Sequence, residues 1–369
     1  LHPSAVLSSD ISNSNRFVVS ACRDGNVRIW DMSHLESGQE ELTQPFRLLD
    51  ADYSDDARHF IIATPEHNAV VWKLGPPIAP AFSLDHQERI GLVAYGPGND
   101  RIITTTAGTV HLWNATTGEP ISTLALDGTQ STIVVFSPDG HQLATATTDQ
   151  RLHIWDAADG QYLRSIGLLA GRVTGIVYHP HDPIVFTSVS SESDESGSTI
   201  QIWNVLDGAA IGPDLEVNGL VRSFVAHPDG ERLLLHIAGK DNDDTHVLFW
   251  NFKDAAPASV RFNHRVPVNL VKLDLSGSRV LTSGIDGSVR LWKATTGEEI
   301  GAPLRHTTPV QDMQFSHHGR FFATATTGGQ VGLWSTAAAI PLMPPLKFDP
   351  GLIRISFHPE DQELMILAG

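Results

Sequence analysis

Short runs in which apolar and polar residues alternate recur along the whole chain. Eight of these runs end in tryptophan, at residues 30, 72, 113, 155, 203, 250, 292 and 334, and VRIW, VHLW and VRLW are examples. Alternation with a period of two residues predicts β-strands that bury one face. Apolar residues at the helical spacing of 3.6 are not sustained anywhere, so the pattern predicts an all-β chain.

The tryptophans also mark a repeat of about 42 residues. Successive tryptophans are separated by 42, 41, 42, 48, 47, 42 and 42 residues. Each tryptophan run follows a second apolar run, such as FVVSA or FFATA, and a third run that ends in a turn rich in Asp, Gly, Pro and His, such as STIVVFSPDG. Three strands and a weakly patterned fourth in every repeat predict the four-stranded blades of a β-propeller.

The repeats fill the chain, so we expect one propeller domain over residues 1–369. Eight full repeats end near the eight tryptophans, and a partial ninth repeat covers residues 346–369. Because both ends fall inside a repeat and residue 1 is Leu, we expect the sequence to be a segment of a longer chain. One ring of about eight blades, nine blades lacking two strands, and part of two tandem seven-bladed propellers all fit this count.

The motifs of the repeat resemble those of the WD40-repeat family. RDGNVRIWD, TDQRLHIWD and IDGSVRLWK combine the family's turn, strand and tryptophan, and FSPDGHQLATA combines its inner turn and second strand. LWNATTGEPI and LWKATTGEEIGAPL are similar to bacterial WD40 arrays. The resemblance covers essentially the whole chain. It implies an all-β propeller of four-stranded antiparallel blades that acts as a non-catalytic scaffold for proteins or peptides.

The resemblance also implies a buried tetrad in each blade, made of a His, a Ser or Thr, an Asp and the Trp. Counting back 28, 10 and 6 residues from the tryptophan finds two complete tetrads, which are His2, Ser20, Asp24 and Trp30 in repeat one and His264, Thr282, Asp286 and Trp292 in repeat seven. Repeat three keeps only His86 and Thr104 with its tryptophan. A buried indole or imidazole without a hydrogen-bond partner costs about 1–3 kcal/mol. We therefore interpret these sets as structural and not as a hydrolase triad.

Composition narrows the expected partners. The chain has 42 acidic and 25 basic residues and a formal charge of -17, which disfavours nucleic acid because phosphates are also negative. The sequence contains no stretch of eighteen apolar residues, so no membrane span is predicted. The single cysteine, Cys22, excludes an internal disulfide and fits a reducing compartment, so we expect a cytoplasmic protein.

Motifs for catalysis or cofactor binding are missing from the sequence. It contains no P-loop, GxSxG, HExxH or GxGxxG. Histidines that could bind a metal, as in YHPHD and AHPDG, follow the first strand in different repeats, which separates them. We expect no enzyme activity, no cofactor and no metal. The alternative is a propeller enzyme or regulatory sensor that uses the central channel.

Candidate partner-binding residues lie in loops that the resemblance places on one face. The extra length of repeats five and six falls between their second and third strands, in two loops with six carboxylates: Glu192, Asp194, Glu195, Asp241, Asp243 and Asp244. We hypothesise that these loops form an acidic rim for a basic partner. Solvated loops or a loose cation site are the alternatives. Further candidates precede the turn aspartate or follow a tetrad histidine, namely Arg23, Thr148, Ile285 and Arg265.

Overall fold

The described part of the chain is built from antiparallel β-strands. The computed structural model describes residues 6–368 apart from 12–16, 23–26, 32–49, 55, 57, 65, 75–78, 125–130, 168–170, 191–196, 240–244, 254–259, 265, 352 and 358–363, and it describes side chains from residue 50 onward, except those of 51, 131, 132, 353, 365, 367 and 368. Across these residues the regular secondary structure is β-strand, and no helix could cross a membrane.

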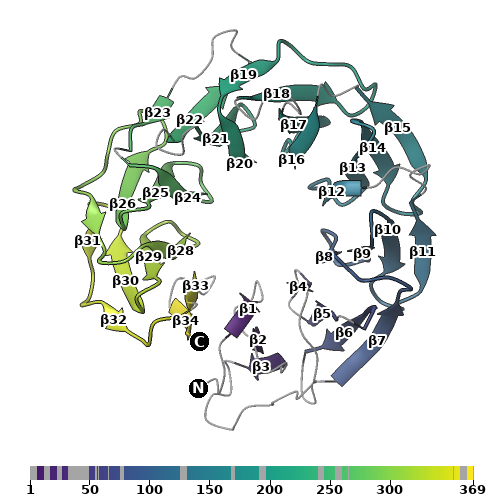
Figure 1. Ribbon diagram of the computed structural model, residues 1–369, viewed down its shortest axis with the longest axis horizontal. Helices are drawn as coiled ribbons and strands as arrows, with labels where there is room; N and C mark the ends of the chain where they lie inside the picture. The colour runs from purple at the N-terminus through teal and green to yellow at the C-terminus, as the bar shows by residue number, and fades with distance from the viewer. Residues whose placement is uncertain are drawn as a thin grey trace. The chain divides into compact units, whose positions relative to one another are not determined.

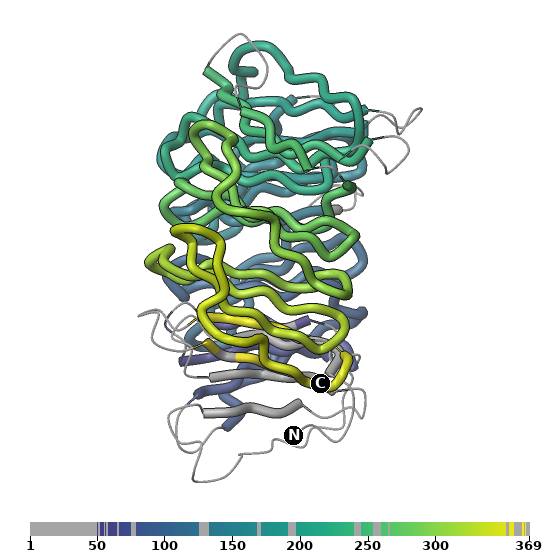
Figure 2. The backbone as a smooth tube through the Cα atoms, turned by 90° about the vertical axis from the view of Figure 1, so that its left-hand side faces the viewer, coloured from purple at the N-terminus to yellow at the C-terminus, as the bar shows by residue number. Residues whose placement is uncertain are grey.

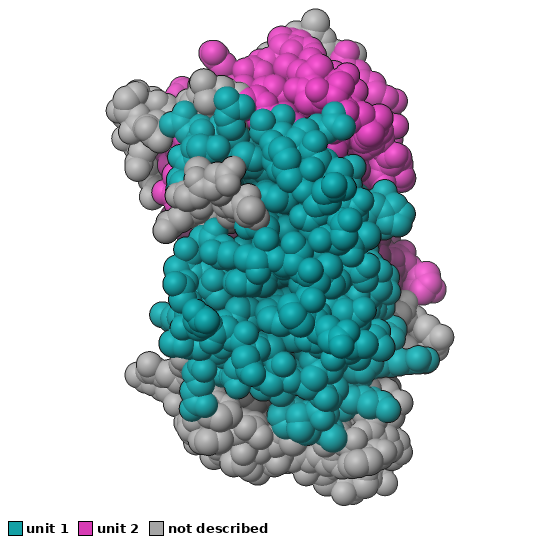
Figure 3. Space-filling view, turned by 90° about the vertical axis from the view of Figure 1, so that its right-hand side faces the viewer, with its two compact units in different colours: residues 1–165, 369 teal, residues 166–368 magenta. Residues whose placement is uncertain are grey.

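The chain divides into two compact units, residues 1–165 with residue 369, and residues 166–368 (Figure 3). In the described residues, unit 1 holds one three-stranded sheet and three four-stranded sheets. We call the sheets blades 1 to 9 in chain order. The strands of blades 1 to 4 are β1 (Val6–Ile11), β2 (Phe17–Cys22), β3 (Val27–Asp31), β4 (Asp50–Tyr53), β5 (His59–Ala63), β6 (Asn68–Lys73), β7 (Ala79–Asp85), β8 (Leu92–Tyr95), β9 (Arg101–Thr105), β10 (Val110–Asn114), β11 (Pro120–Thr123), β12 (Ser131–Phe136), β13 (Gln142–Thr147), β14 (Leu152–Asp156) and β15 (Tyr162–Ile166).

Unit 2 continues the same pattern with blades 5 to 9. Its described sheets are three of four strands, one of five and one of two. The strands are β16 (Arg172–Tyr178), β17 (Ile184–Ser190), β18 (Gly197–Asn204), β19 (Leu215–Asn218), β20 (Leu220–Ala226), β21 (Arg232–Ala238), β22 (Thr245–Asn251), β23 (Val260–Phe262), β24 (Val268–Leu273), β25 (Arg279–Gly284), β26 (Ser288–Lys293), β27 (Leu304–Arg305), β28 (Val310–Phe315), β29 (Phe321–Thr326), β30 (Gln330–Ser335), β31 (Ile340–Pro341), β32 (Leu346–Lys347), β33 (Ile353–Phe357) and β34 (Leu364–Ala368). Figure 2 shows these sheets, teal through green to yellow, packed one beside the next.

The core of each unit lies between consecutive blades. Second strands such as β25 and β29 are buried along almost their whole length, because a neighbouring sheet covers each of their faces. One apolar cluster joins Ile61 and Val71 of blade 2 to Val93 and Trp113 of blade 3. Fully burying one such side chain stabilises the fold by about 1.5–3 kcal/mol. The repeat therefore sets the positions of the loops that join the strands.

Aspartates also link the first strands of neighbouring blades, which lie on the inner side of each unit (Figure 1). In unit 1, Asp50 Oδ2 accepts from the Val93 amide at 2.9 Å and Asp52 Oδ2 accepts from the Tyr95 amide at 2.7 Å. In unit 2, Asp312 Oδ2 accepts from the Ile355 amide at 2.9 Å. A first strand lies at the edge of its sheet, so these carboxylates satisfy backbone donors that the sheet itself leaves unpaired.

Candidate functional site

Five repeat tryptophans donate a hydrogen bond from Nε1 to a fully buried threonine on the second strand of the same blade. The pairs and N···O distances are Trp113–Thr104 (2.9 Å), Trp155–Thr145 (3.0 Å), Trp203–Thr187 (3.1 Å), Trp292–Thr282 (2.8 Å) and Trp334–Thr324 (2.9 Å). The sequence analysis missed Thr187, because the longer loop of repeat five moves it 16 residues ahead of its tryptophan. Allowing for that insertion would have found it.

Blade 3 extends this bond into a continuous series. His86 Nε2 lies 2.7 Å from Thr104 Oγ1, and His86 Nδ1 lies 3.1 Å from the Leu84 carbonyl oxygen. A carbonyl only accepts, so Nδ1 carries the proton and Nε2 accepts from the Thr104 hydroxyl. Burial and the nearby His111 both lower the pKa of His86, which keeps the ring neutral. The series is thus Trp113 to Thr104 to His86 to the Leu84 carbonyl, with no aspartate.

Blade 7 does not form the predicted link from His264 to Asp286. Among the described residues neither ring nitrogen of His264 has a hydrogen-bond partner. Asp286 is exposed and instead accepts from the Ser288 amide at 3.0 Å and the Ser288 hydroxyl at 2.5 Å. Burial, with help from Arg290, lowers the pKa of His264 to about 4, and Asp286 and the Val266 backbone oppose this less strongly. The prediction that Asp286 is a buried acceptor for His264 is therefore wrong.

Blade 4 uses a different histidine beside its turn aspartate. Asp149 accepts from the Thr147 hydroxyl, and His153 Nε2 lies 3.3 Å from Asp149 Oδ2. Burial raises the pKa of Asp149, but the Thr147 hydrogen bond and the charge of His153 outweigh it, so the pKa is lowered. The tetrad of blade 1 cannot be compared in this way. His2 and Asp24 lie outside the described residues, and the side chains of Ser20 and Trp30 lie outside the described side chains.

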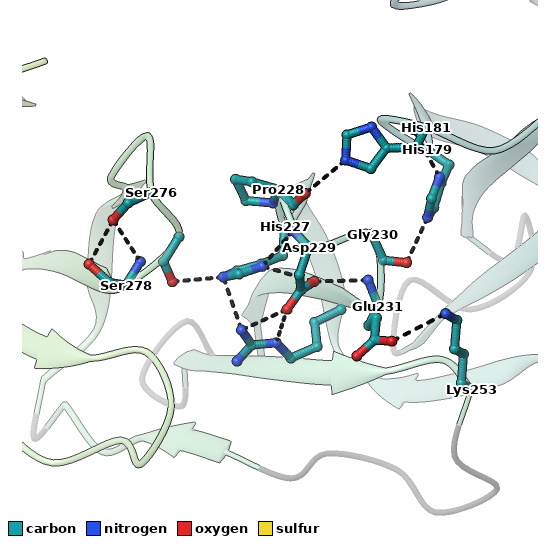
Figure 4. Close-up of polar contacts among 12 residues, drawn as sticks. His179, His181, His227, Pro228, Asp229, Gly230, Glu231, Lys253, Ser276 and Ser278 are labelled. Carbon is teal, nitrogen blue, oxygen red and sulfur yellow. Dashed lines mark hydrogen bonds and ion pairs between the residues drawn. The ribbon is translucent and has the colours of Figure 1, made fainter.

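The described Trp, Thr and His side chains are not arranged for nucleophilic catalysis. Thr104 and Thr282 are completely buried and already accept from an indole, so neither hydroxyl is open to a substrate. Histidines after the first strands bind backbone carbonyls of the next blade instead (Figure 4): His179 Nε2 lies 2.6 Å from Gly230 O, and His227 Nε2 lies 2.7 Å from Gly277 O. Within the described residues no three His, Cys, Asp or Glu side chains are arranged to hold a metal ion.

Two of the predicted partner-binding residues lie on exposed turns. Thr148 is exposed between β13 and β14, and Ile285 is 56% exposed between β25 and β26. Arg23 and Arg265 lie outside the described residues, as do all six carboxylates of the predicted acidic rim: Glu192, Asp194, Glu195, Asp241, Asp243 and Asp244. These assignments stay predictions.

Unit 1 has a surface hollow that the sequence analysis did not anticipate. Its volume is about 650 Å³, within the range of ligand pockets. Three loops line it: the turn between β5 and β6, the loop before β8, and the turn between β9 and β10. The lining residues are His67, Gln87, Glu88, Arg89, Ile90, Gly91, Thr106 and Ala107. The hollow thus lies where the loops of blades 2 and 3 meet, and this is the candidate functional site.

Known proteins contain repeats that are similar to those of this chain. The model of the WD40 family (WD domain, G-beta repeat) matches residues 1–31, 118–156, 258–293 and 299–335. An uncharacterized WD repeat-containing protein of Synechocystis sp. is 25% identical over 138 residues, 37% of this chain and 39% of that protein. The serine-threonine kinase receptor-associated protein of Dictyostelium discoideum is 28% identical over 135 residues, 37% of this chain and 43% of that protein. The matches therefore span less than half of each relative's length.

Solved structures show the same fold. The computationally designed protein Ika8 has a TM-score of 0.66 at 19% identity and matches 90% of this chain and 97% of its own. The C-terminal WD40 domain of Sif2 has a TM-score of 0.64 at 15% identity and matches 87% of this chain and 93% of its own. At these identities the likeness shows the fold alone. The repeat spacing, the Trp–Thr pairs and these folds together show a β-propeller fold, and the four matched segments are similar to WD40 repeats.

Proposed function

We propose that this chain is a non-catalytic scaffold that binds a protein or peptide on the loop face, meaning the loops before first strands and the turns between second and third strands. The observation that supports this most is the contrast between the two kinds of polar group. The Thr hydroxyls that resemble nucleophiles are fully buried. By contrast, His67, Gln87, Glu88 and Arg89 of the hollow are exposed on loops, where binding residues are concentrated in proteins.

The names of two relatives agree with a scaffold. They include a kinase receptor-associated protein and a ribosome biogenesis protein. Both names describe work with other macromolecules. For this chain we propose an interaction partner and not a substrate, together with a cytoplasmic location that fits the single cysteine.

The charge of the chain supports a basic partner. With a formal charge of -17, long-range attraction speeds the approach of a positively charged protein and slows that of an acidic one. The six carboxylates of the predicted rim would strengthen this locally. Such steering fades as salt shortens the Debye length to about 8 Å at physiological ionic strength.

The test is capture of a partner from the source organism with the tagged chain, followed by association kinetics at several salt concentrations. Replacing the six rim carboxylates with Asn or Gln is expected to slow association and flatten its salt dependence. The matched control has the same change in net charge at six other exposed carboxylates: Asp100, Glu119, Glu216, Glu231, Glu298 and Asp349. Equal kinetics for the two variants would overturn the rim. Substrate turnover that survives purification would overturn the scaffold.

A further inference from the structure

Two half-buried histidines lie side by side in unit 1, at the end of the hydrogen-bonded series of blade 3. His86 precedes β8 in the chain, and His111 is on β10. Their rings pack edge-on, with 5.0 Å between the ring centroids. A charge on one ring at this distance disfavours a charge on the other. The pair therefore takes up its two protons in separate steps.

The surroundings of His86 favour the neutral form of its ring. Nδ1 donates to the Leu84 carbonyl, and Nε2 accepts from the Thr104 hydroxyl. A proton on Nε2 would break that second hydrogen bond, and Thr104 already accepts from the tryptophan of the same blade. Burial, and then the charge of His111, lower the pKa of His86, while Asp85 and the Leu84 backbone oppose this less strongly.

The groups around His111 suit both its neutral and its charged form. Nδ1 lies 3.2 Å from Thr123 Oγ1, and Nε2 lies 3.3 Å from Thr106 Oγ1. A hydroxyl can accept as well as donate, so both ring nitrogens can donate when the ring is protonated. Burial lowers the pKa of His111 from its ordinary value of 6.5, and the charge of Glu88 opposes this. His111 is thus the ring that takes up the first proton as the pH falls below 6.5.

Blades 4 and 7 also have a basic residue at the position of His111. His153 and Arg290 pair with the threonine of the second strand as His111 does. His153 Nε2 lies 3.3 Å from Asp149 Oδ2, and Arg290 Nη1 lies 2.7 Å from Glu299 Oε2. Among the described residues, no carboxylate makes such a contact with His111. Blade 7 thus accommodates a permanent positive charge at a position where blade 3 has a group that titrates.

We propose that His86 and His111 form an acid-responsive switch, in which a proton taken up from solvent by His111 draws Glu88 toward that ring and repositions the loop of residues 87–89. Glu88 is exposed in this loop, which follows His86 directly and leads into β8. Its carboxylate acts on His111 through charge, and it makes no hydrogen bond or ion pair with the described residues. Protonation would therefore give blade 3 the contact between base and carboxylate that blades 4 and 7 already have. The switch is independent of the proposed scaffold function.

The first test follows the histidine rings of the full chain by NMR, with ¹³C at Cε1, between about pH 8 and pH 4.5. His111→Gln assigns the signal of His111, and glutamine fits this position because Gln201 occupies it in blade 5. Glu88→Gln is expected to lower the midpoint of the His111 titration by about 0.5 pH unit. The matched control Glu119→Gln removes the same charge from another exposed position of unit 1 and is expected to leave the midpoint unchanged. A midpoint that is the same in wild type and Glu88→Gln would overturn the switch.

The second test measures the loop by hydrogen exchange and mass spectrometry at about pH 7.5 and pH 5, with each rate corrected for intrinsic exchange. Exchange of the amides of residues 87–91 is expected to slow several-fold at the lower pH in wild type and not in His111→Gln. His111→Arg mimics the charged state, as Arg290 does in blade 7, and is expected to slow exchange at both pH values. Equal exchange in wild type and His111→Gln at the lower pH would contradict the movement of the loop, whether or not His111→Arg folds.

Discussion

The tryptophans of blades 3 and 7 both donate to a buried threonine, but only in blade 3 do the hydrogen bonds continue. In blade 3 the Thr104 hydroxyl donates to His86 Nε2, and His86 Nδ1 donates to the Leu84 carbonyl, where the series ends. In blade 7 His264 lies buried without a partner in the described residues, although its blade has the aspartate that blade 3 lacks. The blade with the more complete set of residues by sequence thus has the shorter series.

The difference lies in where the last acceptor comes from. In blade 3 a backbone carbonyl two residues before the histidine is within reach of Nδ1. In blade 7 the Ser288 amide and hydroxyl both donate to Asp286 Oδ1, so the aspartate closes its own turn. An aspartate that closes a turn with its own neighbours is a common local arrangement. It does not exclude a histidine, because Asp149 of blade 4 accepts from Thr147 and still lies 3.3 Å from His153. Residue type and spacing permit a bond but do not decide whether it forms.

The largest expected effect comes from removing the threonine hydroxyls. Thr104→Val leaves both the Trp113 indole and His86 Nε2 without a partner and is expected to lower the free energy of unfolding by about 2–4 kcal/mol. Thr282→Val leaves only the Trp292 indole without a partner, so the free energy of unfolding is expected to fall by about 1–2 kcal/mol. Urea denaturation of both variants measures the difference. Equal losses would mean that the series in blade 3 adds nothing beyond the Trp–Thr bond.

Replacing the histidines should separate the two blades further. His86→Phe removes two hydrogen bonds and leaves the Thr104 hydroxyl with one fewer partner, so a loss of about 1–3 kcal/mol is expected. His264→Phe removes a buried imidazole that makes no hydrogen bond among the described residues, and the change should stay below about 1 kcal/mol. The same denaturation assay applies. A larger loss for His264→Phe would show that His264 has a partner after all.

The acid response of blade 7 is the next smaller effect. Because the pKa of His264 is lowered to about 4 in the folded chain, the unfolded chain binds the proton more readily between about pH 6.5 and 4. Above pH 6.5 the ring is neutral in both states and does not lower the free energy of unfolding. As the pH drops from 6.5 toward 4, the free energy of unfolding falls because the unfolded chain takes up the proton first. His264→Phe should lose part of this slope relative to wild type. Parallel stability curves over that range would contradict the lowered pKa.

The smallest effect is expected for Asp286→Ala. As an exposed residue that only closes its own turn with Ser288, Asp286 should contribute about 0.5–1 kcal/mol, comparable to a side chain that caps backbone amides. Ser288→Ala serves as a companion variant with a similar loss. A loss above about 2 kcal/mol for Asp286→Ala would instead support the sequence-based prediction that Asp286 is a buried acceptor.

The sequence predicted the features that all blades share, but not the side-chain contacts that differ from one blade to the next. The strands, their order and the Trp292–Thr282 bond follow from a spacing that every blade must satisfy to pack on the next. Spacing alone does not determine which hydrogen bonds Asp286 makes, or that His264 has no partner among the described residues. The hollow depends on three loops from two blades, so the pattern of a single repeat does not predict it.

The most direct test of the structural interpretation measures the free energy of unfolding and hydrolytic turnover in Thr104→Val and Thr282→Val. Both variants should be less stable than the wild type, and the loss should be larger for Thr104→Val because it leaves two buried groups without a partner. Turnover in the wild type that Thr104→Val abolishes without loss of stability would instead show that the buried hydroxyl is catalytic, and the structural interpretation of these residues would be wrong.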